Sequence, residues 1–299
     1  MKNLFYRWYS PSAPFKAKSR PNHMVDRFDG NHFRALPHCR HWGLVRGVTA
    51  TGKTDRGGAQ IHAQLSAINF ARAHGLPYHH MPLVKSQHQG QQMSAAERAA
   101  WDENFNFAAT AEPWPSKLPI VSAGELIAGE VTSDCILASA HYHRYCDADP
   151  DSYLKIRTQV RDVNRLPQRR YPKPTIAIHV RRGDVSQDTE PRRFTSNDSV
   201  AKSIAQAKEL LPDASVRVFS EGREEDFAGL PVGCEYELNS DVFETVAGLA
   251  AADCLVMAKS SFSYVAALLN GGTVYYQPFR HKPLSEWRIL DVSTKPDGK

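Results

Sequence analysis

Residues 175–277 alternate between short apolar runs and segments of helical periodicity, and this alternation constrains the fold more than any other feature. The pattern predicts strands and helices in turn: strands at residues 175–180, 215–220, 253–258 and 273–277, and helices at residues 197–211, 242–252 and 260–269. This order is typical of a parallel sheet covered by helices. Ligands of such sheets bind outside the carboxyl ends of the strands, so the residues that follow each strand are the first candidates for a site.

The first part of the chain holds a second, less regular series of the same elements. A strand at residues 43–48, a helix at residues 59–74 and an extended segment at residues 76–84 predict one βαβ unit. A helix at residues 94–104, with a capping box of Ser94 and Glu97, a strand at residues 134–140 and a helix at residues 152–166 follow.

Residues 167–174 contain three prolines and three basic residues between two periodic segments, which predicts an interdomain linker. We therefore expect an α/β protein of two Rossmann-like domains, at residues 1–167 and residues 168–299, that face a central cleft. Residues 1–40 mix Pro, His and Arg with isolated aromatic residues, and we expect them to form a wrapped arm or a substrate loop.

Composition excludes several classes of protein. No run of eighteen apolar residues exists, and the first residues lack an apolar run of signal-peptide length, so we expect a soluble, cytoplasmic protein without a membrane span. The five cysteines include no pair at C-x-x-C spacing, which argues against a zinc knuckle. The net charge of +5 favours an anionic ligand but is too dispersed to indicate nucleic acid, and the oligomeric state is open.

An arginine pair follows the strand predicted at residues 175–180, within the sequence His-Val-Arg-Arg-Gly-Asp at residues 179–184. Guanidinium groups match the oxygens of a diphosphate bidentately, so Arg181 and Arg182 at a strand end fit an anion clamp. The same residues also fit a surface turn with an ion pair between Arg182 and Asp184.

A run of serines lies between a predicted strand and a predicted helix, at Ser260-Ser261-Phe262-Ser263. The free N–H groups of a helix start and the serine hydroxyls bind phosphate well. An ordinary serine N-cap explains the same residues, and by itself this segment favours the cap.

Taken together, the His-Val-Arg-Arg-Gly-Asp and Ser-Ser-Phe-Ser segments resemble the fucosyltransferase superfamily, which includes α1,2-, α1,6- and protein O-fucosyltransferases. Between them, Val218-Phe219-Ser220-Glu221 is similar to a strand end of these families. The resemblance covers residues 175–280. It extends weakly to Gly57 and Gly58, which resemble a Gly-Gly loop at the first helix of the α1,2 branch, although the spacing to Gln60 is shorter here.

The resemblance implies a GT-B fold, a GDP-sugar donor, inversion at the anomeric carbon, and no essential metal or other cofactor. Arg181 matches the arginine that meets the β-phosphate, and His179 matches a residue beside the nucleotide. The segment Ser260-Ser261-Phe262-Ser263 matches the part that meets the diphosphate. Arg182, Asp184, Ser220, Glu221, Gly57 and Gly58 complete the expected donor-binding set.

A catalytic base for the acceptor hydroxyl is harder to place. The α1,6 branch carries a glutamate a few residues after the arginine motif, and Glu190 lies near that position, with Asp188 as the other candidate. Both fit equally well as ordinary loop carboxylates. We expect catalysis to depend chiefly on Arg181, because a transferase without a metal must stabilise the departing diphosphate with fixed donors.

Residues 47–54 satisfy the P-loop pattern at every position. A P-loop needs a strand before it and a helix that begins at its Lys-Thr, here Lys53 and Thr54. Gly57 and Gly58 would break that helix in its first turn. A P-loop phosphotransferase is therefore an alternative hypothesis, but the motif lacks the structural context that a P-loop needs.

Two patterns suggest a metal site, and both have simpler explanations. Asp147-Ala148-Asp149 resembles the Asp-x-Asp of metal-dependent transferases, but an acidic turn before a helix explains it. The pairs His79-His80 and His141-x-His143 show no third ligand. We expect no metal.

The sequence thus predicts an inverting, metal-independent glycosyltransferase that moves fucose from GDP-fucose to a glycan acceptor. Its partners are a nucleotide-sugar donor and a glycan, with no nucleic acid. Another nucleotide-sugar donor, such as a pentose or rhamnose donor, and a non-catalytic sugar-binding relative remain alternatives.

Overall fold

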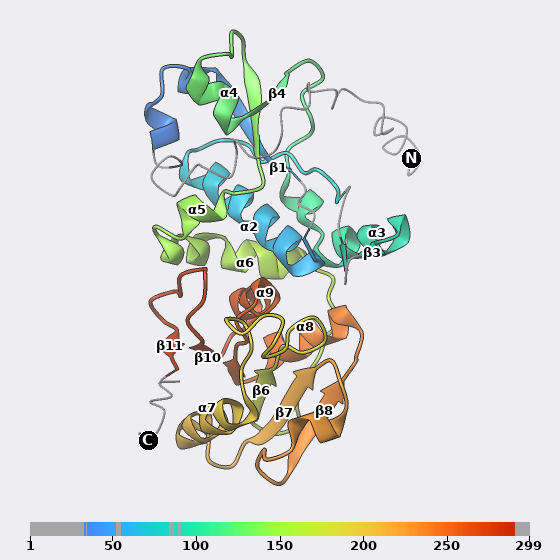
Figure 1. Cartoon of the computed structure of the whole chain (residues 1–299). Helices are drawn as coiled ribbons and strands as arrows, with labels where there is room; N and C mark the ends of the chain where they lie inside the picture. The colour runs from blue at the N-terminus through green and yellow to red at the C-terminus, as the bar shows by residue number, and fades with distance from the viewer. Residues whose placement is uncertain (1–32, 34, 52–54, 84–86, 89–90, 291–299) are drawn as a thin grey trace.

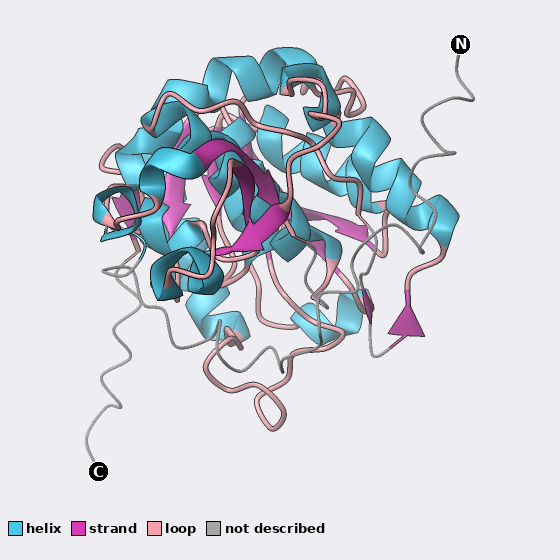
Figure 2. Ribbon diagram, turned by 90° about the horizontal axis from the view of Figure 1, so that it is seen from above, coloured by secondary structure: helices cyan, strands magenta, loops and turns pink. Residues whose placement is uncertain are grey.

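The polypeptide forms two parallel β-sheets, one after the other along the chain, with helices between and around them (Figure 1). The computed structural model describes residues 33, 35–51, 55–83, 87–88 and 91–290. Viewed from above, most of the strands lie in the interior, with helices around them (Figure 2). The predicted arm at residues 1–40 falls almost wholly outside the described residues.

The first sheet has three strands, in the order β1 (Val45–Ala50), β5 (Cys135–Ser139) and β4 (Ile120–Ser122). The helices of this half are α2 (Gly57–Ala73), α3 (Ala95–Phe105), α4 (Ala123–Ala128), α5 (His143–Cys146) and α6 (Leu154–Val163). Short 3-10 helices lie at Leu36–His38, Trp42–Leu44, Phe107–Thr110 and Pro150–Tyr153. A small antiparallel pair joins β2 (Gln87–His88) to β3 (Gln91–Gln92).

The second sheet has six strands, in the order β11 (Arg288–Ile289), β10 (Thr273–Tyr276), β9 (Cys254–Val256), β6 (Thr175–His179), β7 (Ser215–Ser220) and β8 (Cys234–Leu238). Its helices are α7 (Asn197–Leu210), α8 (Val242–Ala251) and α9 (Ser261–Leu269), with a 3-10 helix at Glu224–Phe227. All neighbouring strands of this sheet are parallel, as the alternation of strands and helices predicts.

The predicted strands and helices of residues 175–277 are all present, and the capping box of Ser94 and Glu97 forms at the start of α3. The segment at residues 76–84 differs from the prediction. Its described part forms no regular strand, because Pro77 and Pro82 cannot donate to a ladder, and it runs beside β1 through a single parallel bridge between Val48 and Tyr78. The sequence analysis missed β4, α4, β8 and β11.

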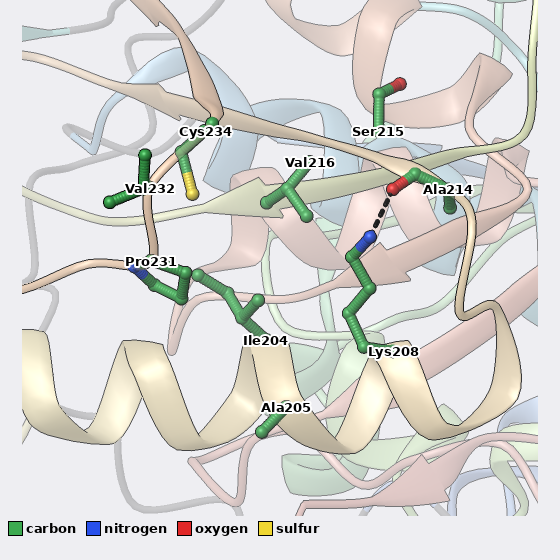
Figure 3. A pocket seen from close by; sticks show the side chains of 10 residues that line it. Ile204, Ala205, Lys208, Ala214, Ser215, Val216, Pro231, Val232 and Cys234 are labelled. Carbon is green, nitrogen blue, oxygen red and sulfur yellow. Dashed lines mark hydrogen bonds between the residues drawn. The ribbon is translucent and has the colours of Figure 1, made fainter.

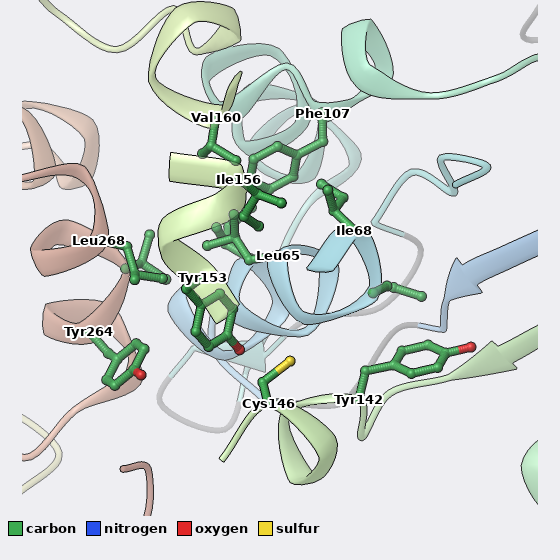
Figure 4. Close-up of a cluster of buried hydrophobic side chains, with 14 of the residues drawn as sticks. Leu65, Ile68, Phe107, Tyr142, Cys146, Tyr153, Ile156, Val160, Tyr264 and Leu268 are labelled. Atoms are coloured by element: carbon green, nitrogen blue, oxygen red, sulfur yellow. The ribbon is translucent and has the colours of Figure 1, made fainter. Parts of the chain in front are cut away.

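Helix α2 is buried along nearly its whole length and lies between the two sheets, where it packs against α9. Leu65 and Ile68 of α2 belong to the same core as Ile156 of α6 and Leu268 of α9 (Figure 4). Helix α7 covers the opposite face of the six-stranded sheet over a second apolar cluster. The two halves therefore share one continuous core.

Helix α2 also buries polar side chains, and several of them are paired with the segment before α6. The Ser66 hydroxyl lies 2.6 Å from the Tyr153 hydroxyl, which lies 3.1 Å from Nε2 of His62. The Asn69 amide donates to the Ser152 hydroxyl at 2.6 Å. Burial raises the pKa of Tyr153 far above its ordinary value, so its phenol stays neutral. These bonds orient α2 against the segment that precedes α6.

Among the described helices, none combines the length and the apolar character that crossing a membrane requires.

Candidate functional site

The carboxyl ends of β6 and β7 and the N-terminus of α9 lie together on the side of the six-stranded sheet that faces α2. His179 ends β6, Ser220 ends β7, and Ser260 is the N-cap of α9. Ser263 of α9 bonds the imidazole of His179, so the two predicted motifs meet although more than eighty residues separate them. The geometry follows from the parallel sheet, whose strand ends share one edge.

Arg181 is held from one side by Asp184. Its Nε and Nη2 atoms donate to the two carboxylate oxygens of Asp184 at 3.2 Å and 2.7 Å. Partial burial opposes ionisation of Asp184, but the hydrogen bond and charge of Arg181 outweigh it and lower the pKa of Asp184. The outer edge of the guanidinium keeps further N–H donors. Asp184 thus orients Arg181 and leaves it able to bind an anion.

Arg56, immediately before α2, brings a further cation to this place from the first half of the chain. Its guanidinium lies 2.9 Å from Asp184 and 3.2 Å from Glu221. The sequence analysis missed Arg56, although its position before the Gly57-Gly58 pair was a usable signal. The carboxylate of Asp184 pairs with Arg181 and Arg56, so the alternative interpretation of this motif, a surface turn with an Arg182–Asp184 ion pair, does not describe the structure.

The N-terminus of α9 is shaped by serines. The Ser260 side chain accepts a hydrogen bond from the Phe262 N–H at 3.2 Å, which confirms the predicted N-cap. Ser263 accepts from the Ala258 N–H at 3.1 Å and bonds Nδ1 of His179. Helix α9 therefore begins in a fixed position relative to β6 and β9.

The starts of α2 and α9 lie against each other. A β-carbon on Gly58 would lie 2.7 Å from Cα of Phe262, and one on Gly57 would lie 2.2 Å from the Trp101 ring. Only glycine allows this approach of two helix ends. The side chain of Arg56, the N-cap residue of α2, makes no capping hydrogen bond to the helix. Two positive helix ends therefore converge beside Arg56 and Arg181, which favours an anion here.

His179 is neutral at physiological pH. The residue keeps some exposure, but its ring is surrounded by protein. This burial lowers the pKa of His179, and the charges of Arg181 and Arg56 lower it further, to about 3. The ring packs on Phe262, with ring centroids 5.3 Å apart. A neutral imidazole beside two arginines can bind a nucleotide without adding charge repulsion.

Arg182 and Ser220 are held by contacts within the protein, and their expected contacts with the donor stay a prediction. The Arg182 guanidinium donates to the Thr195 carbonyl at 3.0 Å and to Asn197 at 2.9 Å, and it stacks on Phe194 at 4.6 Å. The Ser220 hydroxyl donates to the Val180 carbonyl at 2.7 Å. Both residues tie the loops of the site to the sheet.

The two candidate bases, Asp188 and Glu190, lie on an exposed loop between β6 and α7. The Glu190 carboxylate lies 3.9 Å from Nε of Arg193, and the Asp188 N–H donates to Ser186. Their catalytic role stays a prediction.

Two basic residues that were not among the predicted site residues, Arg280 and His281, lie in the loop after β10. Arg280 donates to the Ser261 hydroxyl at 2.9 Å, and Nε2 of His281 lies 3.2 Å from the same oxygen. Burial lowers the pKa of Arg280, and the nearby Arg193 and Arg181 lower it further. A basic pair in the loop that follows a predicted strand was the signal in the sequence. Arg280 thus belongs to the same cationic cluster as Arg181.

Two cavities lie in the second half of the chain. One of about 310 Å³ lies at the start of α7 and is lined by Lys259, Gln277 and Phe194, among others. The other, of about 220 Å³, lies between α7 and the edge strand β8 and is lined by Ile204, Val216 and Cys234 (Figure 3). The arginine cluster lines neither of them.

The P-loop hypothesis is contradicted by the secondary structure. Gly47 lies inside β1, where it pairs with Ile136, and the helix that follows begins at Gly57. Lys53 and Thr54 lie outside the described residues. A P-loop requires the first glycine to leave the strand, and Gly47 does not.

The residues suggested as metal ligands have other contacts. Asp147 accepts a hydrogen bond from the Lys282 N–H at 3.2 Å, and Nδ1 of His79 bonds the Glu112 carbonyl at 3.1 Å. The rings of His141 and His143 pack 5.6 Å apart. Within the described residues, no group of three or more His, Cys, Asp or Glu side chains is arranged to hold a metal ion.

No protein-family model and no curated protein sequence matches this chain. Its structure is similar to that of POFUT1 in complex with GDP, with 12% identity over 75% of this chain and 94% of that one, at a TM-score of 0.39. It is similar to NodZ α-1,6-fucosyltransferase co-crystallised with GDP, with 13% identity, coverages of 75% and 93%, and a TM-score of 0.38. It is also similar to TibC, an iron-containing dodecameric glycosyltransferase from enterotoxigenic E. coli H10407, with 14% identity, coverages of 82% and 62%, and a TM-score of 0.41.

Proposed function

We propose that this chain is a glycosyltransferase of the GT-B type that transfers fucose from GDP-fucose to a glycan acceptor, with inversion and without an essential metal. In this proposal residues 168–299 bind the donor, residues 1–167 bind the acceptor, and the two domains face a cleft. The observation that supports it best is the convergence of Arg181, Arg56 and the starts of α2 and α9 on one place.

This arrangement suits a leaving diphosphate. As the bond between the anomeric carbon and the β-phosphate oxygen breaks, negative charge develops on that oxygen. Arg181, which Asp184 holds in place, and the N–H groups at the start of α9 are fixed donors for it. Arg56 and Arg280 add charge from either side. Because these donors are already oriented by the protein, little reorganisation is needed in the transition state.

Several contacts suit the nucleoside end of the donor. His179 is neutral, so it can lie beside a base or ribose without competing for the diphosphate. Phe262 packs on the same ring and presents an apolar face next to it. Glu221 follows β7 and is held by Arg56, at the place where the resemblance expects a donor-binding residue.

Inversion requires the acceptor hydroxyl to attack from the face opposite the diphosphate. We propose Glu190 as the base that takes the hydroxyl proton, with Asp188 as the second candidate. Both lie on the loop that follows the Arg181 segment, and their exposure allows an acceptor to reach them. Replacing each by its amide and measuring transfer would separate the two.

The first experiment is calorimetric binding of GDP, UDP, ADP and ATP, each with and without magnesium. Binding of GDP that needs no metal and is lost in Arg181→Ala is the expected result. A preference for UDP would retain the site and remove fucose as the donor. ATP binding that depends on magnesium and on Lys53 would overturn the proposal.

A second measurement separates an enzyme from a non-catalytic sugar-binding relative. GDP-fucose is incubated with a mixture of oligosaccharide acceptors, and both GDP release and glycan mass are recorded. We expect release of GDP together with a fucose-sized mass increase on a glycan. Tight GDP-fucose binding with neither product would show a binding protein and contradict the enzymatic proposal.

A further inference from the structure

Ser261, His281 and Asp147 form a chain of hydrogen bonds where three elements meet. Nε2 of His281 lies 3.2 Å from the Ser261 hydroxyl at the start of α9. Nδ1 of His281 lies 3.4 Å from a carboxylate oxygen of Asp147, directly after α5. His281 is 2% exposed, so its ring is removed from water. Both ring nitrogens thus have a partner inside the protein.

The chemistry of these partners sets the direction of each bond. A carboxylate only accepts, so Nδ1 of His281 carries the hydrogen that faces Asp147. In a neutral imidazole the other nitrogen, Nε2, is then an acceptor, and Ser261 donates its hydroxyl hydrogen to it. Arg280 donates to the Ser261 oxygen at 2.9 Å. In this state the Ser261 hydroxyl hydrogen is directed into the protein.

A phosphate oxygen at the start of α9 needs that hydrogen. Ser261 can donate to a ligand and keep its bond to His281 only when Nε2 of His281 carries its own hydrogen and donates to the Ser261 oxygen. That state is the imidazolium, which Asp147 stabilises. We propose that binding of a diphosphate at the start of α9 is coupled to uptake of one proton by His281. This inference rests on the proposed function, and it makes His281 a positioning residue for Ser261.

The proton balance is simple, because no covalent bond to carbon or phosphorus changes. One proton from solvent adds to Nε2 of His281. The Ser261 hydroxyl turns from His281 toward the phosphate, and the bond from Ser261 to Nε2 is replaced by one from Nε2–H to the Ser261 oxygen.

The groups around His281 explain why the proton is taken up with the ligand. The titratable and charged groups that face His281 come from α2, α5, α9 and the loop after β10. They are His62, His143, Asp147, Tyr264 and Arg280. The ring centroid of His62 lies 4.2 Å away, and that of His143 lies 5.2 Å away. Arg280, which shares Ser261 with His281, opposes a second positive charge, whereas Asp147 favours it. A bound diphosphate adds the negative charge that shifts this balance.

The test is calorimetric binding of GDP-fucose to the full chain near neutral pH, in two buffers that differ in ionisation enthalpy. GDP-fucose is chosen because its diphosphate is esterified at both ends and lacks the terminal phosphate group that titrates with a pKa of about 6. We expect the binding enthalpy of the wild type to differ between the two buffers. The difference should correspond to the uptake of up to about one proton. The affinity then falls by up to about tenfold per pH unit as the pH rises from the pKa of His281 in the free protein toward its higher pKa in the complex, and it levels off above that.

Three variants assign the proton. His281→Gln places an amide N–H near the position of Nε2, so it donates to Ser261 permanently and should bind GDP-fucose with no proton uptake. Asp147→Asn removes the carboxylate that stabilises the imidazolium and should weaken both binding and uptake. Asp151→Asn is the matched control, because Asp151 also holds this segment but does so at Ser285, whose N–H donates to its carboxylate at 2.7 Å.

Each outcome decides a different point. Wild-type binding with the same heat in both buffers would overturn this inference and leave the proposed function intact. Uptake that persists in His281→Gln would also overturn it, because the proton would then go to another group, such as His179. Absence of binding by GDP and GDP-fucose would overturn the proposed function and this inference together.

Discussion

Gly58 of α2 lies so close to Phe262 of α9 that a β-carbon on the glycine would stand 2.7 Å from the Cα atom of the phenylalanine. The contact joins the first turns of two helices that come from opposite halves of the chain. Each helix start carries the equivalent of about half a positive charge. Their approach is unfavourable by itself and becomes favourable when an anion lies between or beside them, so the contact links the packing of the halves to ligand binding.

Gly58→Ala should therefore lower both stability and nucleotide affinity. The added methyl group meets backbone atoms of Phe262, which cannot move aside as the end of a side chain can. We expect a loss of about 1–3 kcal/mol in the free energy of unfolding, as for other overpacked sites. Denaturant unfolding and GDP calorimetry measure the two effects. Gly43→Ala is the control, since nothing lies within 4 Å of its β-carbon.

Arg181 and Arg182 are adjacent in the sequence, but the structure predicts that replacing the first affects activity and replacing the second affects stability. Arg181→Ala should reduce transfer by about 100- to 1,000-fold, the usual effect of losing one donor to a developing oxyanion. Arg182→Ala should mainly reduce the free energy of unfolding, because it breaks contacts to Thr195, Asn197 and Phe194. Kinetics and thermal unfolding of both variants test this pair of expectations. Equal losses of activity at equal stability would contradict the structural role of Arg182.

His179 should make stability depend on pH. Its pKa is lowered from 6.5 to about 3 in the folded protein. Between these values the unfolded chain binds a proton that the folded chain does not, so acidification through this window favours unfolding. His179→Gln removes this contribution, and its stability should fall less steeply than that of the wild type from pH 6.5 downward. Denaturant unfolding across this range tests the difference, and the two slopes should coincide above pH 6.5.

Arg56 should matter for the donor although it belongs to the first half. Arg56→Ala removes a charge that pairs with Asp184 and Glu221, and with it a donor near the proposed diphosphate site. We expect the KM for GDP-fucose to rise by about tenfold, the size of one charge-assisted hydrogen bond. The control is Arg46→Ala, which loses a pair with Asp134 that lies on an exposed surface. Equal effects of the two variants would show that Arg56 acts through general charge alone.

Much of the second half could be predicted from sequence because its signals are local. Apolar runs predict the strands of residues 175–277, and Ser260 predicts the cap that α9 has. The edge strand β8 does carry a local signal, because its apolar residues alternate with Glu235 and Glu237 as in a half-buried strand, but it is not the continuous apolar run that marks the inner strands. Arg217 pairs with both carboxylates and makes the strand stable, and no local pattern shows that pairing.

By itself, the sequence determined that a parallel sheet forms and that Arg181 and Ser260 follow its strand ends. The tertiary structure decided which groups share the site. Asp184 pairs with Arg181 and with the distant Arg56, not with Arg182, and Asp147 reaches His281 across 134 residues. The physical reason is that periodicity depends on neighbours along the chain, whereas these pairings depend on which helix starts and strand ends pack together.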